Sequence, residues 1–191
     1  MGLTLVSYKT CSDEELLPAI ENGNTPAFDE LYGRYGQKIF GYFYRMLWKN
    51  KELAEDFTQE LFLKLIKNAA TFKTDHSFST WLYSIANNMC KNEYRKQGVR
   101  IQHQQQKITV VSAEPVSPDM RRFKEAVHNC TNDLPEDKKT LYMLRFHENL
   151  SVPDISRILN LPEGTIKSRI FYLLKEMKTK LKAFETLTTY P

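Results

Sequence analysis

The sequence predicts an all-α protein made of two small helical domains joined by a flexible linker. Three observations lead to this fold class. Apolar residues recur three and four positions apart through residues 10–98, which is the spacing of amphipathic helices. The same spacing returns through residues 121–184. Between these ranges, residues 99–120 are rich in glutamine, contain two prolines and have no helical periodicity, so we expect a linker there.

Four helices are expected in the first domain. Ser12 and Glu15 have the spacing of a capping box, which predicts that a short helix begins there. Pro26 suits the first turn of a long second helix, where its missing N–H costs nothing. A third apolar stripe begins at Leu53, and a fourth runs over residues 78–97. We expect the buried stripe of the fourth helix to contain Trp81, Leu82, Ile85, Ala86 and Met89.

Two polar faces of the first domain are candidates for binding. Opposite its apolar stripe, the third helix shows Glu55, Asp56, Gln59, Glu60 and Lys64. The end of the fourth helix carries amide and basic side chains, which are Asn88, Lys91, Asn92, Arg95 and Lys96. Asparagine can hydrogen-bond base edges, and lysine and arginine can hold phosphates.

Aromatic residues lie near the loop that precedes the fourth helix, at Phe72, Phe78, Trp81 and Tyr83. Proteins that bind single-stranded DNA often stack unpaired bases on such rings over a basic groove. Taken alone, Trp81 is better explained as a core residue and Asn88 as an exposed polar residue. Only the combination of rings, amides and basic groups favours binding of opened DNA.

Two short helix signals joined by a tight turn follow in residues 134–181. Ser151 is a good N-cap, and Asp154 follows at the third position, where an acidic group helps to cap the first turn. Asn160 tolerates the left-handed conformation and Pro162 blocks continuation, so the chain turns there before a second helix. The apolar residues that would face a core are Ile155, Ile158 and Leu159. This arrangement is typical of a helix-turn-helix, which places its second helix in the DNA major groove.

The second helix of this pair combines an apolar stripe with a basic, aromatic face. The stripe consists of Ile166, Ile170, Leu173, Leu174, Met177 and Leu181. The opposite face carries Ser168, Phe171, Tyr172, Lys175 and Lys178, with Lys167 beside them. Residues 165–182 hold six basic residues and one acidic residue, and the chain's formal excess of +4 lies after residue 120. Such a cluster attracts phosphate and predicts salt-dependent DNA binding; a lysine-rich solvated helix is the alternative.

Composition argues against several other classes of protein. A hydrophobic content of 41% is enough for a core, yet no apolar run is long enough to span a bilayer and no secretory signal opens the chain. The three cysteines lie far apart and the four histidines are scattered, so we expect no metal site and no disulfide. Neither a phosphate loop nor a nucleophile elbow occurs. We therefore expect a reduced, cytoplasmic protein without a cofactor that is not an enzyme.

Four sequence blocks together resemble a known family. They are FDELYGRYGQKIFGYFYRML, ELAEDFTQELFLKLIKN, TFKTDHSFSTWLYSIANNMCKNEYRK, and LPEDKKTLYMLRFHENLSVPDISRILNLPEGTIKSRIFYLLKEMKTKL. In order and spacing, from about Glu15 to Leu181, they resemble the extracytoplasmic-function (ECF) sigma factors of bacterial RNA polymerase. The resemblance implies sigma domain 2 over residues 10–98, for core binding and minus-10 recognition and melting. It also implies a linker over 99–120 and sigma domain 4 over 121–184, for minus-35 recognition.

The resemblance also implies partners and residue roles. The partners would be promoter DNA, an anti-sigma factor and core polymerase, the last bound through its beta-prime clamp and beta flap. Polymerase would meet Asp56, Gln59, Glu60 and Lys64. The loop over residues 71–77 would capture a base flipped from the minus-10 element, and that element would also meet Asn88, Lys91, Asn92, Arg95 and Lys96. The minus-35 element would meet Thr165, Lys167, Ser168, Arg169, Phe171, Tyr172 and Lys175.

Three residues depart from the family pattern. Asn149 and Asn160 stand where the family often has glycine, and both can adopt left-handed geometry. Tyr172 stands where many members carry arginine, and a phenol cannot make the bidentate contact to guanine that arginine makes. We therefore expect an altered minus-35 preference.

Two other interpretations remain open from the sequence alone. The first is a stand-alone, dimeric helix-turn-helix regulator that binds a palindromic duplex without polymerase. The second is a helical interaction module whose basic helix is merely solvated. A promoter-specificity subunit is preferred because a repressor needs no strand-melting surface.

Overall fold

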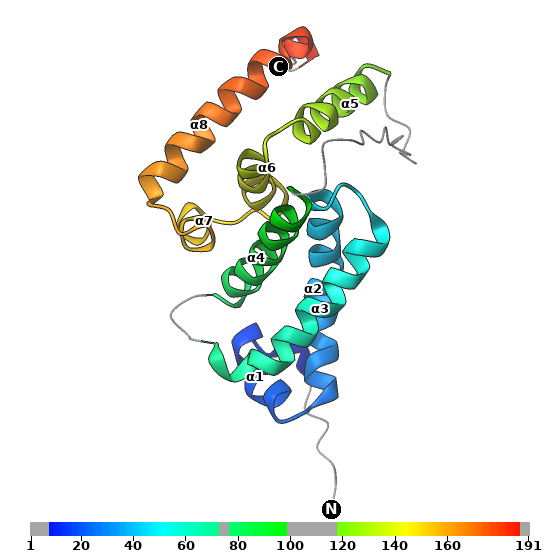
Figure 1. Cartoon of the computed structure of the whole chain (residues 1–191), viewed down its shortest axis with the longest axis vertical. Coiled ribbons are helices and arrows are strands. Elements are labelled where there is room, and N and C mark those ends of the chain that lie inside the picture. The colour runs from blue at the N-terminus through cyan, green and yellow to red at the C-terminus, as the bar shows by residue number, and fades with distance from the viewer. Residues whose placement is uncertain (1–7, 73–76, 99–117, 188–191) are drawn as a thin grey trace, which may run out of the picture. The chain divides into compact units, whose positions relative to one another are not determined.

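The computed structural model describes residues 8–72, 77–98 and 118–187, and within these ranges all regular structure is helical (Figure 1). This confirms the all-α prediction. Contacts divide the chain into two compact units, the first holding α1–α4 and the end of α7, and the second holding α5, α6, α8 and the start of α7. The predicted linker lies largely outside the described residues, although α5 begins at Pro118, within its predicted range. The limits of the two functional domains stay predictions.

The first unit begins with a 3₁₀ turn (Tyr8–Thr10) and four α-helices: α1 (Asp13–Glu21), α2 (Thr25–Met46), α3 (Lys51–Asn68) and α4 (Phe78–Gly98). A second 3₁₀ turn, Ala69–Thr71, follows α3. The predicted capping box is present, since Glu15 N donates to Ser12 Oγ at 3.3 Å and Ser12 N donates to Glu15 Oε2 at 2.6 Å. The side chains of Asn24 and Asn50 cap α2 and α3, each accepting one hydrogen bond from the backbone N–H three residues further on. Local sequence signals therefore fix the starts of α1, α2 and α3.

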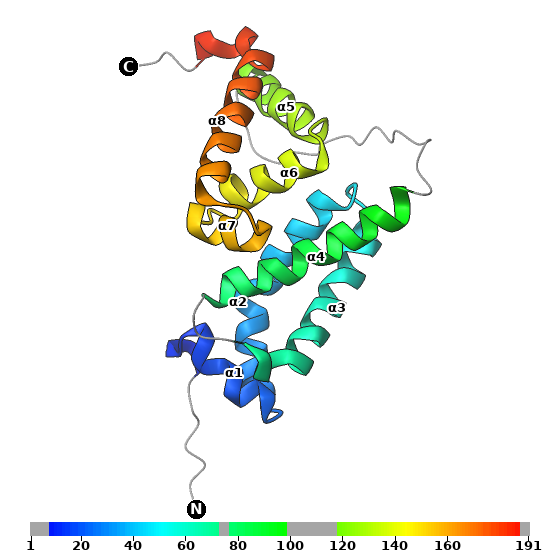
Figure 2. The same ribbon diagram turned by 60° about the vertical axis from the view of Figure 1, so that its left-hand side comes forward.

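The core of the first unit is rich in aromatic residues. Tyr42 and Phe43 on α2 are fully buried, and their rings meet those of Tyr83 and Phe57 edge-on, each at 5.5 Å. These edge-on pairs join α2 to α4 and α3, and α2 packs along α3 (Figure 2). The predicted stripe of α4 is buried at Leu82, Ala86 and Met89. The prediction is wrong for Trp81 and Ile85, which are only half-buried.

The second unit contains α5 (Pro118–Asn132), α6 (Glu136–Tyr142), the start of α7 (Val152–Leu159) and α8 (Glu163–Lys180). A π-helical turn, Met143–His147, continues α6, and a 3₁₀ segment, Lys182–Leu187, follows α8. The buried side chains come from all four helices and from the π-helical turn, and include Cys130, Leu141, Leu144, Ile155, Ile166 and Leu173. Asn149 and Asn160 adopt φ values of 54° and 53°, so both take the left-handed conformation that the sequence predicted.

Candidate nucleic-acid interface

The helices α7 and α8 are joined by a tight turn, and one face of α8 is exposed to solvent. Ser151 caps α7, because Asp154 N donates to Ser151 Oγ at 3.2 Å and the Ser151 hydroxyl donates to the Asp154 carboxylate. After the left-handed Asn160, the Ser156 hydroxyl donates to the carbonyl of Leu161 at 2.5 Å. Leu161 N in turn donates to the Ser156 carbonyl at 3.0 Å. Two hydrogen bonds between Ser156 and Leu161 thus close the turn between α7 and α8.

The exposed face of α8 carries two large aromatic side chains. Phe171 is 63% exposed and Tyr172 is 66% exposed, and their rings meet edge-on at 5.5 Å. Ser168 and Lys175 lie one turn before and after them and are also exposed. A soluble domain gains nothing from two solvated neighbouring rings, so this face has the character of a contact surface.

The buried face of α8 differs from its prediction at one position. Ile166, Leu173 and Met177 are buried, as expected. Leu174 is 45% exposed, so its assignment to the buried stripe is wrong. A position next to Leu173 is rotated by about 100° around a helix, which carries Leu174 out of the core. Ile170 and Leu181 are half-buried at the edges of the stripe.

Several charges on α8 have partners within the second unit. Lys167 Nζ lies 3.7 Å from Glu163 Oε2, and a terminal nitrogen of Arg169 lies 4.0 Å from Asp137 Oδ2 on α6. Arg169 therefore lies on the flank of α8 rather than at the centre of the aromatic face. Thr165, in the first turn, is half-buried.

The end of α4 forms a second polar surface. Asn88, Asn92, Arg95 and Lys96 are exposed and Lys91 is half-buried. Their spacings of three and four residues place all five predicted side chains on one face of the helix. The neighbouring Asn87 is buried, and within the described residues neither its amide nitrogen nor its amide oxygen has a hydrogen-bond partner.

The aromatic residues near the start of α4 divide into core and surface rings. Phe78 and Tyr83 are buried and belong to the core, so the sequence signal of a ring cluster overstated their availability to DNA. Phe72 and Trp81 are half-buried, and their rings meet at 5.6 Å. Part of the predicted base-capture loop, residues 73–76, lies outside the described residues.

The polar face of α3 is exposed at Asp56, Gln59 and Glu60, and Lys64 Nζ pairs with Glu60 Oε1 at 2.7 Å. Leu63 was not predicted to belong to this surface, yet its side chain is 57% exposed on the same face. The signal was that five of the six residues Leu61–Ile66 are apolar, because a helix cannot bury so many neighbouring apolar side chains on one side.

Two further features bear on the class of protein. Within the described ranges, no three His, Cys, Asp or Glu side chains gather closely enough to hold a metal ion. Among the same residues, no helix is long and apolar enough to cross a membrane. The tight turn between α7 and α8 and the exposed rings on the basic α8 are the features of a helix-turn-helix DNA-binding protein.

Comparison with known proteins identifies the family. Residues 31–100 match the family model of Sigma-70 region 2, and residues 124–177 match that of Sigma-70, region 4. The chain is 34% identical over 173 residues to the RNA polymerase sigma-H factor of Pseudomonas aeruginosa, covering 83% of this chain and 88% of that protein. It is 31% identical over 187 residues to the ECF RNA polymerase sigma-E factor of Haemophilus influenzae, covering 90% and 96%.

Two solved structures share the fold. CnrH in complex with the cytosolic domain of CnrY aligns with a TM-score of 0.63 at 20% identity, covering 90% of this chain and 96% of that one. The sigma factor RpoE of Bartonella quintana, in complex with the anti-sigma factor NepR, aligns with a TM-score of 0.59 at 23% identity, covering 88% and 92%.

The chain belongs to the ECF sigma factors of RNA polymerase. It directs polymerase to promoters for transcription initiation, and its family consists of binding subunits rather than enzymes. The interpretations as a stand-alone regulator or a solvated interaction module are thereby excluded.

Proposed function

We propose that this sigma factor reads minus-35 DNA with α8, engages opened minus-10 DNA with α4 and docks on core polymerase with α3. The observation that carries the proposal is the exposed pair Phe171 and Tyr172 on the basic α8. We assign the minus-35 contacts to that pair together with Thr165, Lys167, Ser168, Arg169 and Lys175. These functions correspond to domains over residues 10–98 and 121–184, joined by residues 99–120.

The base preference of α8 follows from the chemistry of Tyr172. Its hydroxyl offers one hydrogen bond and its ring offers apolar contact, whereas arginine grips guanine with two donors. Tyr172→Arg would therefore shift the preferred base at one minus-35 position toward guanine. Transcription from a minus-35 library randomised at each position would reveal the shift, and an unchanged preference would contradict the assignment.

For the minus-10 element we assign Asn88, Lys91, Asn92, Arg95 and Lys96. The amides supply donors and acceptors for the edges of unpaired bases, and the basic groups hold the strand's phosphates. Flipping a base costs a few kcal/mol of lost stacking. The half-buried rings of Phe72 and Trp81 are suited to return part of this cost by stacking.

For core polymerase we assign Asp56, Gln59, Glu60 and Lys64 to the beta-prime clamp, and we add Leu63. Covering a fully exposed leucine is worth about 1.5–3 kcal/mol, so covering one that is 57% exposed is worth about 1 kcal/mol. Leu63→Ala should then weaken core binding about fivefold. Asp29→Ala, a change at an exposed position of α2, is the control, and equal losses in a core-binding titration would contradict the assignment.

The relatives also suggest a regulatory partner and a location. CnrH and RpoE share this fold and were each solved with a bound protein, which is an anti-sigma factor in the case of RpoE. We propose that an anti-sigma factor binds this chain as well. Because a sigma factor acts together with RNA polymerase, we place the chain in the cytoplasm.

Run-off transcription with purified core polymerase tests the proposal as a whole. Core enzyme with the chain should produce transcripts from defined starts, which can be mapped after overexpression in cells. In a gel-shift assay without core, binding to the same promoter should be weak. The absence of any specific transcript, or tight promoter binding without core, would refute the proposed division of labour.

A further inference from the structure

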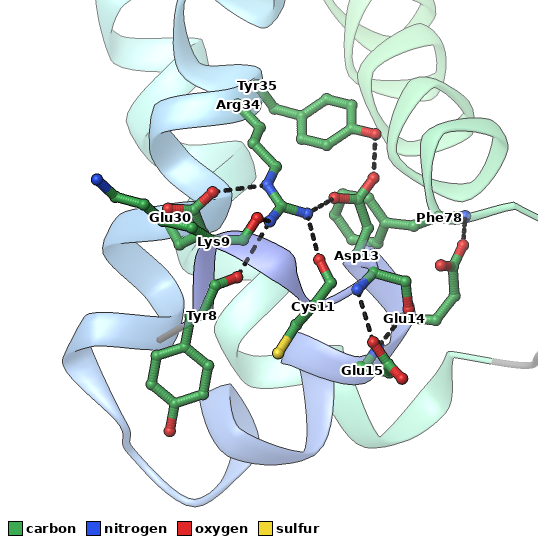
Figure 3. A network of polar contacts seen from close by, with 11 residues as sticks. Tyr8, Lys9, Cys11, Asp13, Glu14, Glu15, Glu30, Arg34, Tyr35 and Phe78 are labelled. Atoms are coloured by element: carbon green, nitrogen blue, oxygen red, sulfur yellow. Dashed lines mark hydrogen bonds and ion pairs between the residues drawn. The ribbon is translucent and has the colours of Figure 1, made fainter. Parts of the chain in front are cut away.

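A single arginine ties the N-terminal segment to α2 (Figure 3). All five N–H groups of Arg34 have an acceptor within 3.3 Å: the carboxylates of Glu30 and Asp13 and the carbonyls of Cys11, Tyr8 and Lys9. The shortest contact joins a terminal nitrogen of Arg34 to Asp13 Oδ1 at 2.7 Å. Because a guanidinium presents its donors in a rigid planar fork, this set of contacts fixes the segment in one geometry.

Asp13 connects this arginine to a second side chain of α2. The Tyr35 hydroxyl donates to Asp13 Oδ2 at 2.5 Å. Burial, followed by the hydrogen bond to Asp13, raises the pKa of the Tyr35 phenol well above its usual range. Tyr35 therefore stays a hydrogen-bond donor at all physiological pH values, and the start of α1 is held by two neighbouring residues of α2.

The next residue, Glu14, reaches from α1 to α4. Glu14 Oε1 accepts a hydrogen bond from Phe78 N, the first residue of α4, at 2.9 Å, as Figure 3 shows. The first N–H groups of a helix have no partner within the helix, and a carboxylate there is favoured by the helix dipole. The Phe78 ring also meets the Tyr35 ring at 5.2 Å. Both the backbone and the side chain of Phe78 are thus held by α1 and α2.

The start of α4 lies beside the rings that we propose to stack on opened minus-10 DNA. The Phe78 ring lies 6.3 Å from that of Phe72 and 5.9 Å from that of Trp81. These two half-buried rings are the proposed stacking partners, and α4 continues from there to Asn88 and the basic residues. A surface that binds opened DNA must be held rigidly, because loosely held sites lose their productive geometry.

We propose that Arg34, Asp13 and Glu14 form a brace that positions α4 for promoter opening, without touching DNA themselves. This inference rests on the proposed role of α4 at the minus-10 element. It assigns a function to the N-terminal segment, Tyr8–Glu14, for which the sequence predicted only the start of a helix.

Two variants and a matched control test the brace. Glu14→Ala removes the acceptor at Phe78 N, and Arg34→Lys keeps the charge but loses the planar fork. Glu15→Ala removes the same charge one residue further along α1. It loses the hydrogen bond from Ser12 N to Glu15 Oε2 and keeps that from Glu15 N to Ser12 Oγ. Each full-length variant is combined with core polymerase on a promoter whose start site has been mapped for this chain.

The measured quantity is the rate of open-complex formation, followed by permanganate reactivity of unpaired thymines. Glu14→Ala and Arg34→Lys should slow opening of duplex promoter by about tenfold, the factor that corresponds to 1.4 kcal/mol, which is near the value of one charge-assisted hydrogen bond. Both should transcribe a template with a pre-opened minus-10 bubble at close to the wild-type rate, because the unstacking step is already complete. Affinity for core should not change. Glu15→Ala should behave as wild type on both templates.

Four results separate the possibilities. Equal defects on duplex and pre-opened templates would overturn the brace, and so would a parallel loss of core affinity, because both indicate a general loss of folded protein. Glu14→Gln keeps an oxygen acceptor and should open the promoter faster than Glu14→Ala. A glutamine variant as slow as the alanine variant would count against the hydrogen bond to Phe78. If the wild-type chain directs no specific transcript, the proposed function fails rather than the brace.

Discussion

Two adjacent leucines on α8 allow a direct test of how the second unit is packed. Leu173 is 1% exposed, whereas Leu174 is 45% exposed. Leu173→Ala and Leu174→Ala delete the same atoms from the same helix. Both exchange leucine for alanine at a helix-interior position, so their effects on helix propensity are nearly equal. Any difference in stability therefore comes from burial.

The expected magnitudes follow from that burial. Removing a fully buried leucine side chain costs about 2–5 kcal/mol, because a cavity adds to the lost transfer free energy. At Leu174 no cavity remains, and about half of the 1.5–3 kcal/mol for full burial is lost. We expect a loss in the free energy of unfolding of about 3 kcal/mol for Leu173→Ala and about 1 kcal/mol for Leu174→Ala.

Urea unfolding of the full chain measures both values. The chain has two tryptophans, Trp48 and Trp81, and both lie in the first unit, so their fluorescence reports that unit alone. Far-UV circular dichroism reports both units, and the variants should shift only the part of its transition that comes from the second unit. If the two variants lower the stability equally, then α8 does not pack with Leu173 inside and Leu174 outside.

Three other predictions concern function, polar burial and pH. Phe171→Ala should reduce minus-35-dependent transcription about tenfold, or 1.4 kcal/mol, while the urea midpoint moves little, because the ring is mostly exposed; a matching loss of stability would assign it to the core. Asn87→Leu should raise the free energy of unfolding by about 1–3 kcal/mol, because it replaces a buried amide without partners by an apolar group of similar shape, and a destabilised variant would reveal a partner for the amide. The hydrogen bonds from Lys138 and Lys180 lower the pKa of Glu176 below its ordinary value of 4.5, so its contribution to stability is present above that pH and is lost as the pH falls through the lowered pKa. Glu176→Gln should flatten the pH dependence of unfolding below pH 4.5 and leave its shape at neutral pH unchanged, as measured by thermal unfolding.

The sequence was sufficient where structure depends on local chemistry. The capping pair Ser12 and Glu15, the cap at Ser151 and the left-handed Asn160 all occur as predicted, because each involves residues close together in the chain. Helical periodicity also separated Phe171 from Leu173 correctly.

The sequence was insufficient where structure depends on which helix packs against which. Periodicity gives the direction of an apolar stripe but not its width, so Leu174 and Trp81 were placed in stripes that do not bury them fully. Leu63 was overlooked for the converse reason, since it lies within an apolar run yet outside the core. The contact of Arg34 with Asp13 spans 21 residues, and that of Glu14 with Phe78 spans 64, and no local pattern encodes either.

Several basic side chains of α8 form ion pairs with carboxylates of the same protein. Of its basic side chains, three pair with carboxylates of the second unit, which are Lys167 with Glu163, Arg169 with Asp137, and Lys180 with Glu176. Each of these three side chains would have to give up its carboxylate partner to bind a phosphate, so its net contribution to the free energy of DNA binding is small. Lys175 is exposed, lies one turn from Phe171, and has no carboxylate partner within the described residues. We therefore expect Lys175 to make the strongest phosphate contact of this helix.

Salt dependence tests this expectation. Each phosphate neutralised by a protein contributes about 0.9 to the slope of log K against log salt. Lys175→Ala should reduce the slope for promoter binding by the holoenzyme by about 0.9. Lys124→Ala, which removes the same charge from an exposed position on α5, should leave the slope unchanged. Equal slopes for both variants and wild type would mean that α8 holds DNA through its paired residues instead. A helix with few uncommitted charges binds duplex weakly by itself, and this weakness suits a subunit whose promoter affinity is supplied jointly with polymerase.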